Sequence, residues 1–454
     1  MGEELSSDIG KIINTPNPRT AALGYSAILY NVDKNEEVNI DLLKEVTFER
    51  NYNTDYMEII NIDFNLAGDD YARVVGGDGD RLEIAITESV DGIDEPYERS
   101  KRYIFLLSSN MENRDTNYTR NMSNNEQGKH TVMPVQGQCC DPVTSGMKAA
   151  YSDKVFKGHN VMDIIKREIK EQSAKIKVEG KPLNISIDAY DKFNTTSYDN
   201  IHIPTGTRTI DLPGYFQKGK YGVYPGGVGS FIQYSWKEER YINYIYPLYS
   251  EDRVEEEKRK LIVYYPSDPK MATAKNTWMI DGDLTKIIAA EVKSNNPGRN
   301  RAIANGTEVV KSKPEDSLTI GTNKRSLEGA DKGKELTSDP TNRMSGSSSK
   351  STKSGLGGRQ TYIKNTSNDL NAGMDYILQN MIDVTVTWRY SDMDIIYPGM
   401  PVKFISTDNR YGVIEQNGTV QVIYSSYNAT YKKMDSFLIL KVSMPTYEEE
   451  ETYT

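Results

Sequence analysis

One stretch decides the fold class of this chain: Arg81-Leu82-Glu83-Ile84-Ala85-Ile86-Thr87. Its apolar and polar residues alternate, so Leu82, Ile84 and Ile86 share one face of an extended backbone. Strict alternation predicts a half-buried β-strand whose apolar face packs on a core and whose polar face meets solvent. The chain around this stretch is therefore expected to be β-rich.

Similar short runs occur on both sides of it, separated by turns rich in Gly, Asp and Asn. We expect strands over residues 26–32, 47–50, 57–66, 102–107, 131–135 and 154–156. Short strands at this spacing are typical of a small antiparallel barrel or sandwich. The sequence thus predicts a first β-barrel-like domain over residues 19–157, preceded by an N-terminal arm, residues 1–18.

The hydrophobic period changes after Lys157-Gly158-His159. Val161, Ile164, Ile165 and Ile169 recur at helical spacing, and Asn160 stands where a helix N-cap is expected. Further apolar runs at 230–234, 241–248 and 260–265 suggest strands, whereas 283–292 fits a helix or a strand equally well. Residues 158–293 are therefore expected to form an α/β insertion domain.

The last third of the chain starts without any period. Residues 294–366 are rich in Gly, Ser and Lys and cannot bury enough apolar surface to offset chain ordering, so we expect a disordered or extended insertion. A helical stripe (Leu370, Met374, Ile377, Leu378, Met381) and short strands then predict a second β-barrel-like domain over 367–446. Residues 447–454 form an acidic tail. The predicted fold class is mainly β, with two small antiparallel barrel-like domains flanking an α/β domain and a long insertion.

Composition excludes several classes of protein. The 454 residues contain no apolar run of 18 or more, so no membrane-spanning helix is expected, and the acidic start lacks the pattern of a secretory signal. A net charge of −10 argues against tight, sequence-independent binding of nucleic acid, which needs Lys and Arg to neutralise phosphates.

No motif points to catalysis. His130, His159 and His202 lack metal-ligand spacing, and the adjacent Cys139 and Cys140 cannot easily bridge each other. The segment Gly76-Gly77-Asp78-Gly79-Asp80 resembles an acidic cation-binding loop, but a turn needs the same residues, and we favour the turn. We therefore predict no catalytic residue, no metal site and no cofactor, and expect the chain not to be an enzyme.

Tyrosine is unusually frequent, with 31 Tyr against 9 Phe. Tyr suits interfaces assembled from soluble parts, because an apolar ring carries a polar tip. Codon bias explains the excess equally well.

The order of these segments resembles the baseplate hub proteins of contractile-tailed bacteriophages and related tail-tip hubs. In that family, stretches similar to Val155-Phe156-Lys157-Gly158 and Val161–Ile169 end a first barrel and open an α/β insertion. A stretch similar to Ile377–Phe404, with its Pro398-Gly399 step, leads into a second barrel, and an aromatic strand like Tyr241–Tyr244 lies between them.

The resemblance implies a homotrimeric structural virion protein. Two barrels per subunit would give six in a ring, joining a three-fold central spike to six-fold tail tube proteins, with baseplate wedge or tape-measure proteins as further partners. It implies a place in the tail baseplate after assembly in the host bacterial cytoplasm, a part in tail assembly and genome ejection, and phage DNA passing an acidic lumen without specific binding. We further hypothesise that outer, edge-exposing strands contact the tube and that the Tyr-rich segments 241–246 and 424–431 pack between subunits.

Two other functions remain open at this stage. Tyrosine-rich β domains also line glycan sites, so a receptor- or glycan-binding virion tail protein is the first alternative. A tail-associated cell-wall hydrolase is the second, since it needs only a paired acid and nucleophile or base among the 65 Asp and Glu.

Overall fold

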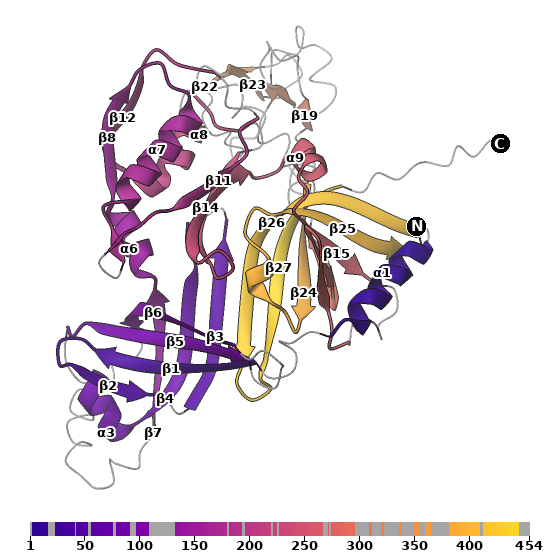
Figure 1. Cartoon of the computed structure of the whole chain (residues 1–454). Helices are drawn as coiled ribbons and strands as arrows, with labels where there is room; N and C mark the ends of the chain where they lie inside the picture. The colour runs from indigo at the N-terminus through magenta and orange to yellow at the C-terminus, as the bar shows by residue number, and fades with distance from the viewer. Residues whose placement is uncertain are drawn as a thin grey trace.

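The computed structural model describes most of the chain outside its long insertion. The described residues are 2–16, 23–40, 42–52, 56–75, 79–90, 97–108, 132–178, 181–192, 196–218, 221–224, 227–266, 271, 274–295, 308–310, 319–321, 336–337, 348–353, 359–364, 381–408 and 412–444. Strands predominate, as the sequence predicts (Figure 1).

The first β region consists of seven antiparallel strands in the order β2-β1-β5-β6-β7-β4-β3. The decisive alternation at 81–87 forms β5, where Leu82, Ile84 and Ile86 are all buried. The strands are β1 (Leu23–Asn31), β2 (Glu36–Asn39), β3 (Leu42–Asn51), β4 (Ile59–Ala67), β5 (Leu82–Val90), β6 (Tyr97–Leu107) and β7 (Val132–Cys140). Two short helical turns, α3 (Gly68–Asp70) and a π-helical turn (Tyr71–Val75), follow β4.

The α/β part has a hydrophobic core of its own. Its main helix confirms the predicted start, because the Asn160 side chain accepts a hydrogen bond from the Asp163 amide. The elements are α6 (Pro142–Ala149), β8 (Tyr151–Phe156), α7 (Val161–Ser173), β9 (Lys177–Val178), β10 (Lys181–Pro182), β11 (Ser186–Ala189), β12 (Ile201–Arg208), a 3₁₀ turn (Thr209–Asp211), α8 (Leu212–Lys218), β13 (Val228–Ser235), β14 (Arg240–Pro247) and α9 (Glu251–Glu256).

The second β region draws on the chain on both sides of the insertion. Strands β15 (Lys260–Tyr265), β16 (Trp278–Asp281), β17 (Leu284–Ile288) and β18 (Glu291–Asn295) precede it, and β24 (Met381–Arg389), β25 (Pro401–Asp408), β26 (Gly412–Asn428) and β27 (Lys433–Ser443) follow it. A 3₁₀ turn, Met393–Ile395, lies between β24 and β25. The ambiguous run 283–292 is extended. The strand pairs within the predicted second domain, β24–β27, β25–β26 and β26–β27, are antiparallel as expected. Strand β15, which the sequence placed in the α/β domain, instead joins this region and runs parallel to both β17 and β25.

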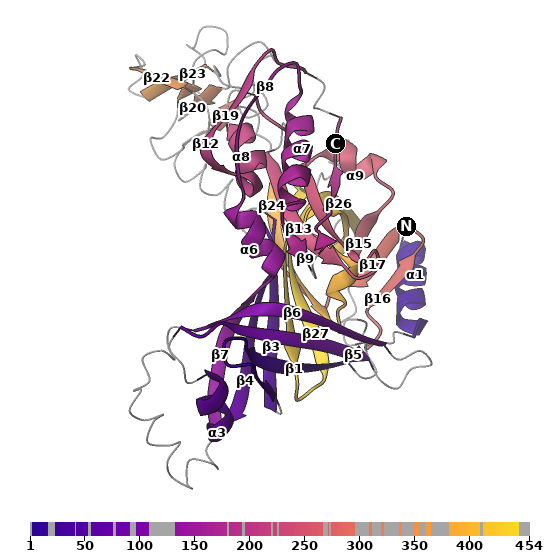
Figure 2. The same ribbon diagram turned by 60° about the vertical axis from the view of Figure 1, so that its left-hand side comes forward.

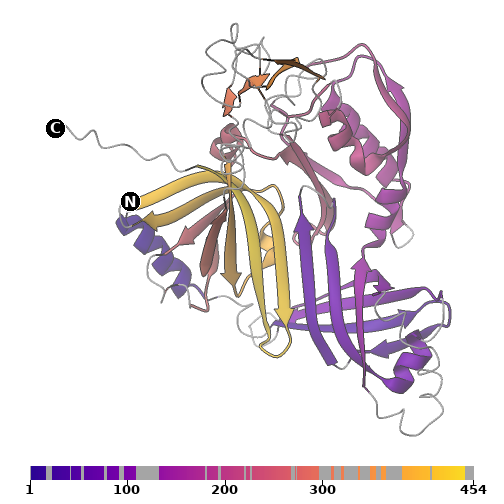
Figure 3. The ribbon, with the colours of Figure 1, turned by 180° about the vertical axis from the view of Figure 1, so that it is seen from behind.

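The two β regions share one fifteen-stranded sheet. Strand β3 pairs with β26 from Glu45↔Asn428 to Asn51↔Val422, so edge strands that could have curled into separate barrels instead pair with each other (Figures 1 and 3). Among the described strands no ladder closes into a barrel. The two barrel-like domains of the prediction are thus open parts of one sheet, because an edge strand satisfies its backbone groups equally well in a neighbouring region.

The described pieces of the insertion are five short strands, which pair only with one another. They are β19 (Glu308–Val310), β20 (Thr319–Gly321), β21 (Leu336–Thr337), β22 (Ser348–Lys353) and β23 (Arg359–Lys364). Of the predicted helical stripe, Leu370, Met374, Ile377 and Leu378 lie outside the described residues. Its last member, Met381, is the first residue of strand β24. The predicted acidic tail lies outside them as well. The disorder expected for most of 294–366 stays a prediction.

The predicted N-terminal arm contains a helix, α1 (Gly2–Asn14). It lies along the outer flank of the second β region, beside β16 and β17 (Figure 2). No helix in the described part of the chain is long and apolar enough to cross a membrane.

Candidate functional site

The three parts of the molecule meet at a buried cluster of aromatic rings around one arginine, which we call the Arg253 junction. The Arg253 guanidinium lies 3.5 Å from the centre of the Tyr246 ring and donates a hydrogen bond of 2.6 Å to the Gly399 carbonyl oxygen. The Tyr52 hydroxyl, from the end of the first β region, donates to the Tyr246 carbonyl at 2.8 Å. The Arg253 side chain on α9 therefore contacts both β14 and the loop that precedes β25.

Glycine is required on two sides of the Tyr52 ring. A Cβ atom on Gly229 would lie 2.1 Å from that ring, and one on Gly399 would lie 2.7 Å from it. Gly399 also has a φ of +85°, which other residues rarely adopt. The Pro398-Gly399 step of the sequence is thus the place where backbone from the second β region approaches an aromatic side chain of the first.

A second set of contacts, a buried ionic network, also joins the first β region to the second β region. Arg50 on β3 donates to Glu58 at 2.5 Å and to the Met393 carbonyl at 2.7 Å, and Arg99 on β6 pairs with Asp394 at 3.0 Å. Burial acts to lower the pKa of Arg50, but the carboxylates of Glu58 and Asp394 outweigh burial and raise it. This Arg50 network fixes the turn at 393–395 against the first β region.

Lys101 on β6 holds the α/β part to the first β region. Its ammonium nitrogen pairs with Asp141 at 2.6 Å and lies 4.9 Å from the ring centres of Tyr234 and Tyr241 and 5.3 Å from that of Tyr103. The Tyr241 hydroxyl donates to Asp141 at 2.9 Å. The cation, the carboxylate and the rings therefore form one unit, which we call the Lys101 cage.

The tyrosines at these contacts lie inside one chain, so the hypothesis that residues 241–246 pack between subunits is wrong. Tyr244 is 3% exposed and stacks on Tyr397 with ring centres 4.3 Å apart, and Tyr246 is 2% exposed. Burial raises the pKa of Tyr244 to about 12. In the segment 424–431, Tyr427 is buried as well, whereas Tyr431 is 71% exposed at the β26–β27 turn.

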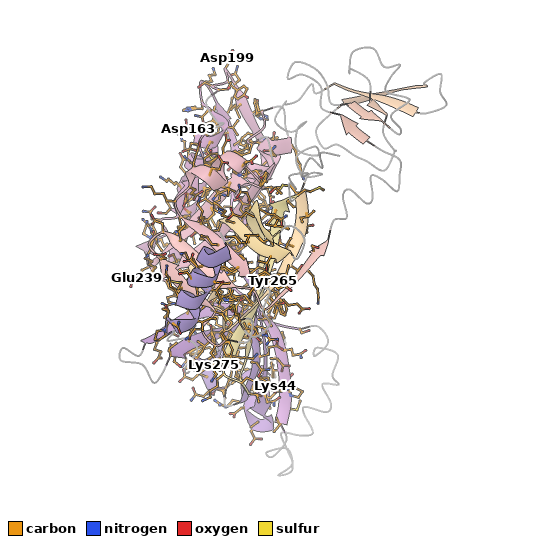
Figure 4. All side chains as sticks on the ribbon, turned by 90° about the vertical axis from the view of Figure 1, so that its right-hand side faces the viewer. Lys44, Asp163, Asp199, Glu239, Tyr265 and Lys275 are labelled. Carbon is orange, nitrogen blue, oxygen red and sulfur yellow. The ribbon has the colours of Figure 1, made fainter. Side chains whose placement is uncertain are left out.

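The outer face of the first β region carries a shallow polar hollow. Its polar lining comes from β3, β4 and β7 (Glu45, Thr47, Asn61, Asp63, Gln136 and Gln138), and Ile62, Leu106 and Leu107 add apolar surface. The nearby Lys44 lies 3.5 Å from Asp63 and is thereby partly neutralised (Figure 4). This face is acidic to neutral, so it would not attract a polyanion.

The residues that the sequence singled out do not form a reactive site. His159, which follows β8, forms an isolated backbone β-bridge with Tyr198. His202 lies on β12, and His130 lies outside the described residues. Where the chain is described, no group of three or more His, Cys, Asp or Glu side chains is placed to hold a metal ion.

The two cysteines are free, and burial raises the pKa of both thiols. The segment at 76–80 is described only at its end. There Gly79 has a φ of +82°, and Asp80 accepts a hydrogen bond from Asn31 and pairs with Lys34, both at 2.7 Å. Because residues 76–78 lie outside the described part of the chain, the choice of a turn over a cation-binding loop stays a prediction.

Sequence reasoning missed the residues that join the three parts. Arg253 lies in a charged run, residues 251–259, that is typical of a solvated surface, and no local pattern marks it as buried. Arg50 ends the predicted strand 47–50 and Lys101 precedes the predicted strand 102–107, and no local pattern marks either cation as buried. The sequence analysis singled out Pro398-Gly399 and the Tyr-rich segment 241–246, but not the contacts that they make.

No protein-family profile matches this chain, and no curated protein matches it in sequence. The solved structures to which it is similar include tail proteins and a type VI secretion component. The tail protein from Neisseria meningitidis is 10% identical, with a TM-score of 0.41, over 92% of this chain and 96% of that one. The 43 kDa tail protein of a Shewanella oneidensis prophage is 9% identical, with a TM-score of 0.45, over 92% and 96%. A component of the Escherichia coli type VI secretion system is 6% identical, with a TM-score of 0.39, over 89% and 74%.

Proposed function

We propose that this chain is a structural subunit of a phage tail or phage-like injection machine and serves as its baseplate or tail-tip hub. The observation that carries the proposal is the pairing of β3 with β26, which sets two β regions side by side in one sheet. Such a chain offers two neighbouring β units to a larger ring. This is the arrangement that the sequence resemblance implies for a hub.

The proposed assembly is a homotrimer. Three copies would present six β regions, so that the same subunit could face a three-fold spike on one side and a six-fold tube on the other. Tail tube proteins, a central spike protein and baseplate wedge or tape-measure proteins are the proposed partners. The edge strand β16, with Ile280 56% exposed, is a candidate for the tube-facing contacts that we hypothesised for edge strands.

The internal junctions support a mechanical role. The Arg253 junction, the Arg50 network and the Lys101 cage connect the three parts by buried contacts, which resist relative movement of the parts under load. We propose that the chain is not an enzyme. We also propose that the polar hollow on β3, β4 and β7 faces the path of DNA, where carboxylates and amides prevent sticking.

The mass of the purified chain in solution, measured by light scattering coupled to size exclusion, tests this proposal. A stable species near three times 51.3 kDa, showing a ring by electron microscopy, is the expected result. A monomer that binds bacterial surface polysaccharide would instead favour the receptor-binding function. A clear zone in a peptidoglycan zymogram would overturn the non-enzymatic assignment.

A further inference from the structure

The polar hollow on the outer face of the first β region is large enough to hold a ligand. Its volume is about 570 Å³, within the range of about 300–1,000 Å³ that is usual for sites of small molecules. It crosses four neighbouring strands, in the order β3, β4, β7 and β6. The function proposed above uses only the lack of cations in this hollow and assigns no ligand to its hydrogen-bonding groups.

Strand register places the carboxylates of the hollow in one row. Glu45, Asp63 and Gln136 are successive cross-strand partners on β3, β4 and β7. Glu45 accepts a hydrogen bond of 2.6 Å from the Ser426 hydroxyl. Asp63 accepts one of 3.0 Å from the Gln136 amide and lies 3.5 Å from the Lys44 ammonium. The side chains of this row therefore already have partners within the chain.

The next row, which we call the amide row, has its hydrogen-bonding groups unused. Thr47, Asn61, Gln138 and Leu106 follow one another across β3, β4, β7 and β6. Within the described residues, neither the Thr47 hydroxyl nor the two amides take part in a hydrogen bond. Leu106, at the end of the row, is 49% exposed. One hydroxyl, two amides and an aliphatic side chain are thus available to a ligand.

The chemistry of the amide row selects a neutral ligand with many hydroxyl groups. An amide side chain offers both donors and an acceptor, and a sugar hydroxyl group also donates and accepts. Leu106 offers apolar contact to the C–H face of a sugar ring. A phosphate or sulfate group would instead meet Glu45 and Asp63, and none of the described lining residues is a Lys or Arg. A purely apolar ligand would leave the amides unpaired.

The spacing of the row favours an extended oligosaccharide over a single sugar. Neighbouring strands lie about 4.8 Å apart, so the four positions of the amide row span about 14 Å. One strand spacing is close to the length of one sugar unit in an extended glycan. Successive sugar units would therefore each meet one side chain of the row, whereas a monosaccharide would contact only one or two of them.

We propose that the polar hollow binds an extended, neutral oligosaccharide along the amide row. The amides of Asn61 and Gln138 pair with hydroxyl groups of adjacent sugar units, and Leu106 packs against a sugar ring. This proposal does not rest on the hub function. It is compatible with a face that DNA passes, because a surface without free cations repels phosphate and still forms hydrogen bonds with a neutral glycan.

Isothermal titration calorimetry of the full-length chain with cellohexaose and chitohexaose tests the proposal. Both probes are neutral, extended hexasaccharides, and we expect at least one of them to bind. The double substitution Asn61→Ala and Gln138→Ala should weaken this binding about tenfold, since it removes two hydrogen-bonding side chains. A sulfated heparin hexasaccharide should bind the unmodified chain at least about tenfold more weakly than the neutral probe, because of the carboxylates.

Asn200→Ala is the matched control, because Asn200 is exposed and lies in the α/β part. Its neighbour Asp199 and Lys44 beside the hollow are labelled at opposite ends of the molecule in Figure 4. The control should bind the probe as the unmodified chain does. If the double variant fails to fold, Leu106→Asp at a half-exposed position gives the same comparison and should also weaken binding.

Three results would overturn the proposal: no binding of either neutral hexasaccharide at millimolar concentration, binding that the substitutions in the amide row leave unchanged, or heparin binding as tight as that of the neutral probe. Assembly is measured separately by light scattering. A trimer that binds no glycan would leave the proposed hub function intact, and glycan binding by a monomer would support this site while contradicting the hub.

Discussion

Replacing Arg253 with methionine should weaken the molecule where its three parts meet. Arg253 is 2% exposed, donates to the Gly399 carbonyl, pairs with Glu257 at 2.7 Å and covers the Tyr246 ring. Methionine retains most of the apolar stem but none of these polar contacts. The Gly399 carbonyl would lose this buried donor, and Glu257 would lose its cation.

The expected magnitude follows from the interactions that methionine cannot make. A hydrogen bond from a charged donor contributes about 1.5–3 kcal/mol, and a desolvated cation–π contact contributes about 2 kcal/mol. Breaking a buried ion pair by removing one partner costs about 3–5 kcal/mol. These terms describe the same side chain and overlap, so we expect a loss of about 3 kcal/mol in the free energy of unfolding.

Urea denaturation followed by tryptophan fluorescence measures this loss, and hydrogen exchange of α9 and residues 397–400 locates it. Arg259→Met is the matched control, because Arg259 is exposed and lies 4.9 Å from the Tyr397 ring. The control should lose less than about 1 kcal/mol. A loss for Arg253→Met no larger than that of the control would refute the view that this arginine stabilises the junction.

Three further predictions concern single positions. Gly229→Ala forces a Cβ into the Tyr52 ring and should cost about 1–3 kcal/mol in urea denaturation, and a neutral result would show that the ring can move. Asn160→Ala should cost about 1 kcal/mol by removing the cap of α7, with Asn160→Ser as the control that restores it; equal stabilities would contradict this cap. Folding raises the pKa of both thiols, so less thiolate is present at pH 8 in the folded chain than in the unfolded chain. A thiol reagent should therefore label Cys140 slowly and Cys139 only after unfolding. Rapid labelling of both cysteines would contradict the described burial.

The sequence predicted the elements that depend on local periodicity. The alternation at 81–87 and the helical spacing after Asn160 appear in the structure as β5 and α7, because each pattern has one way to bury its apolar side. The run 283–292 stayed ambiguous because its apolar residues fit both periods. Its extended form, β17 and β18, is fixed by pairing with β15 and β24, strands that lie earlier and much later in the chain.

The sequence by itself determined that this is a mainly β chain with an α/β insertion, since side-chain period and turn residues act over a few positions. Tertiary structure alone decided that β3 pairs with β26, that Tyr244 and Tyr246 lie inside one chain, and that Arg253 is buried. Each of these depends on which distant strand supplies a hydrogen-bonding edge or an apolar surface, and no local pattern encodes that choice. The barrels expected from the spacing of strands are therefore one continuous sheet, and the tyrosines expected at subunit contacts hold that sheet to the α/β part.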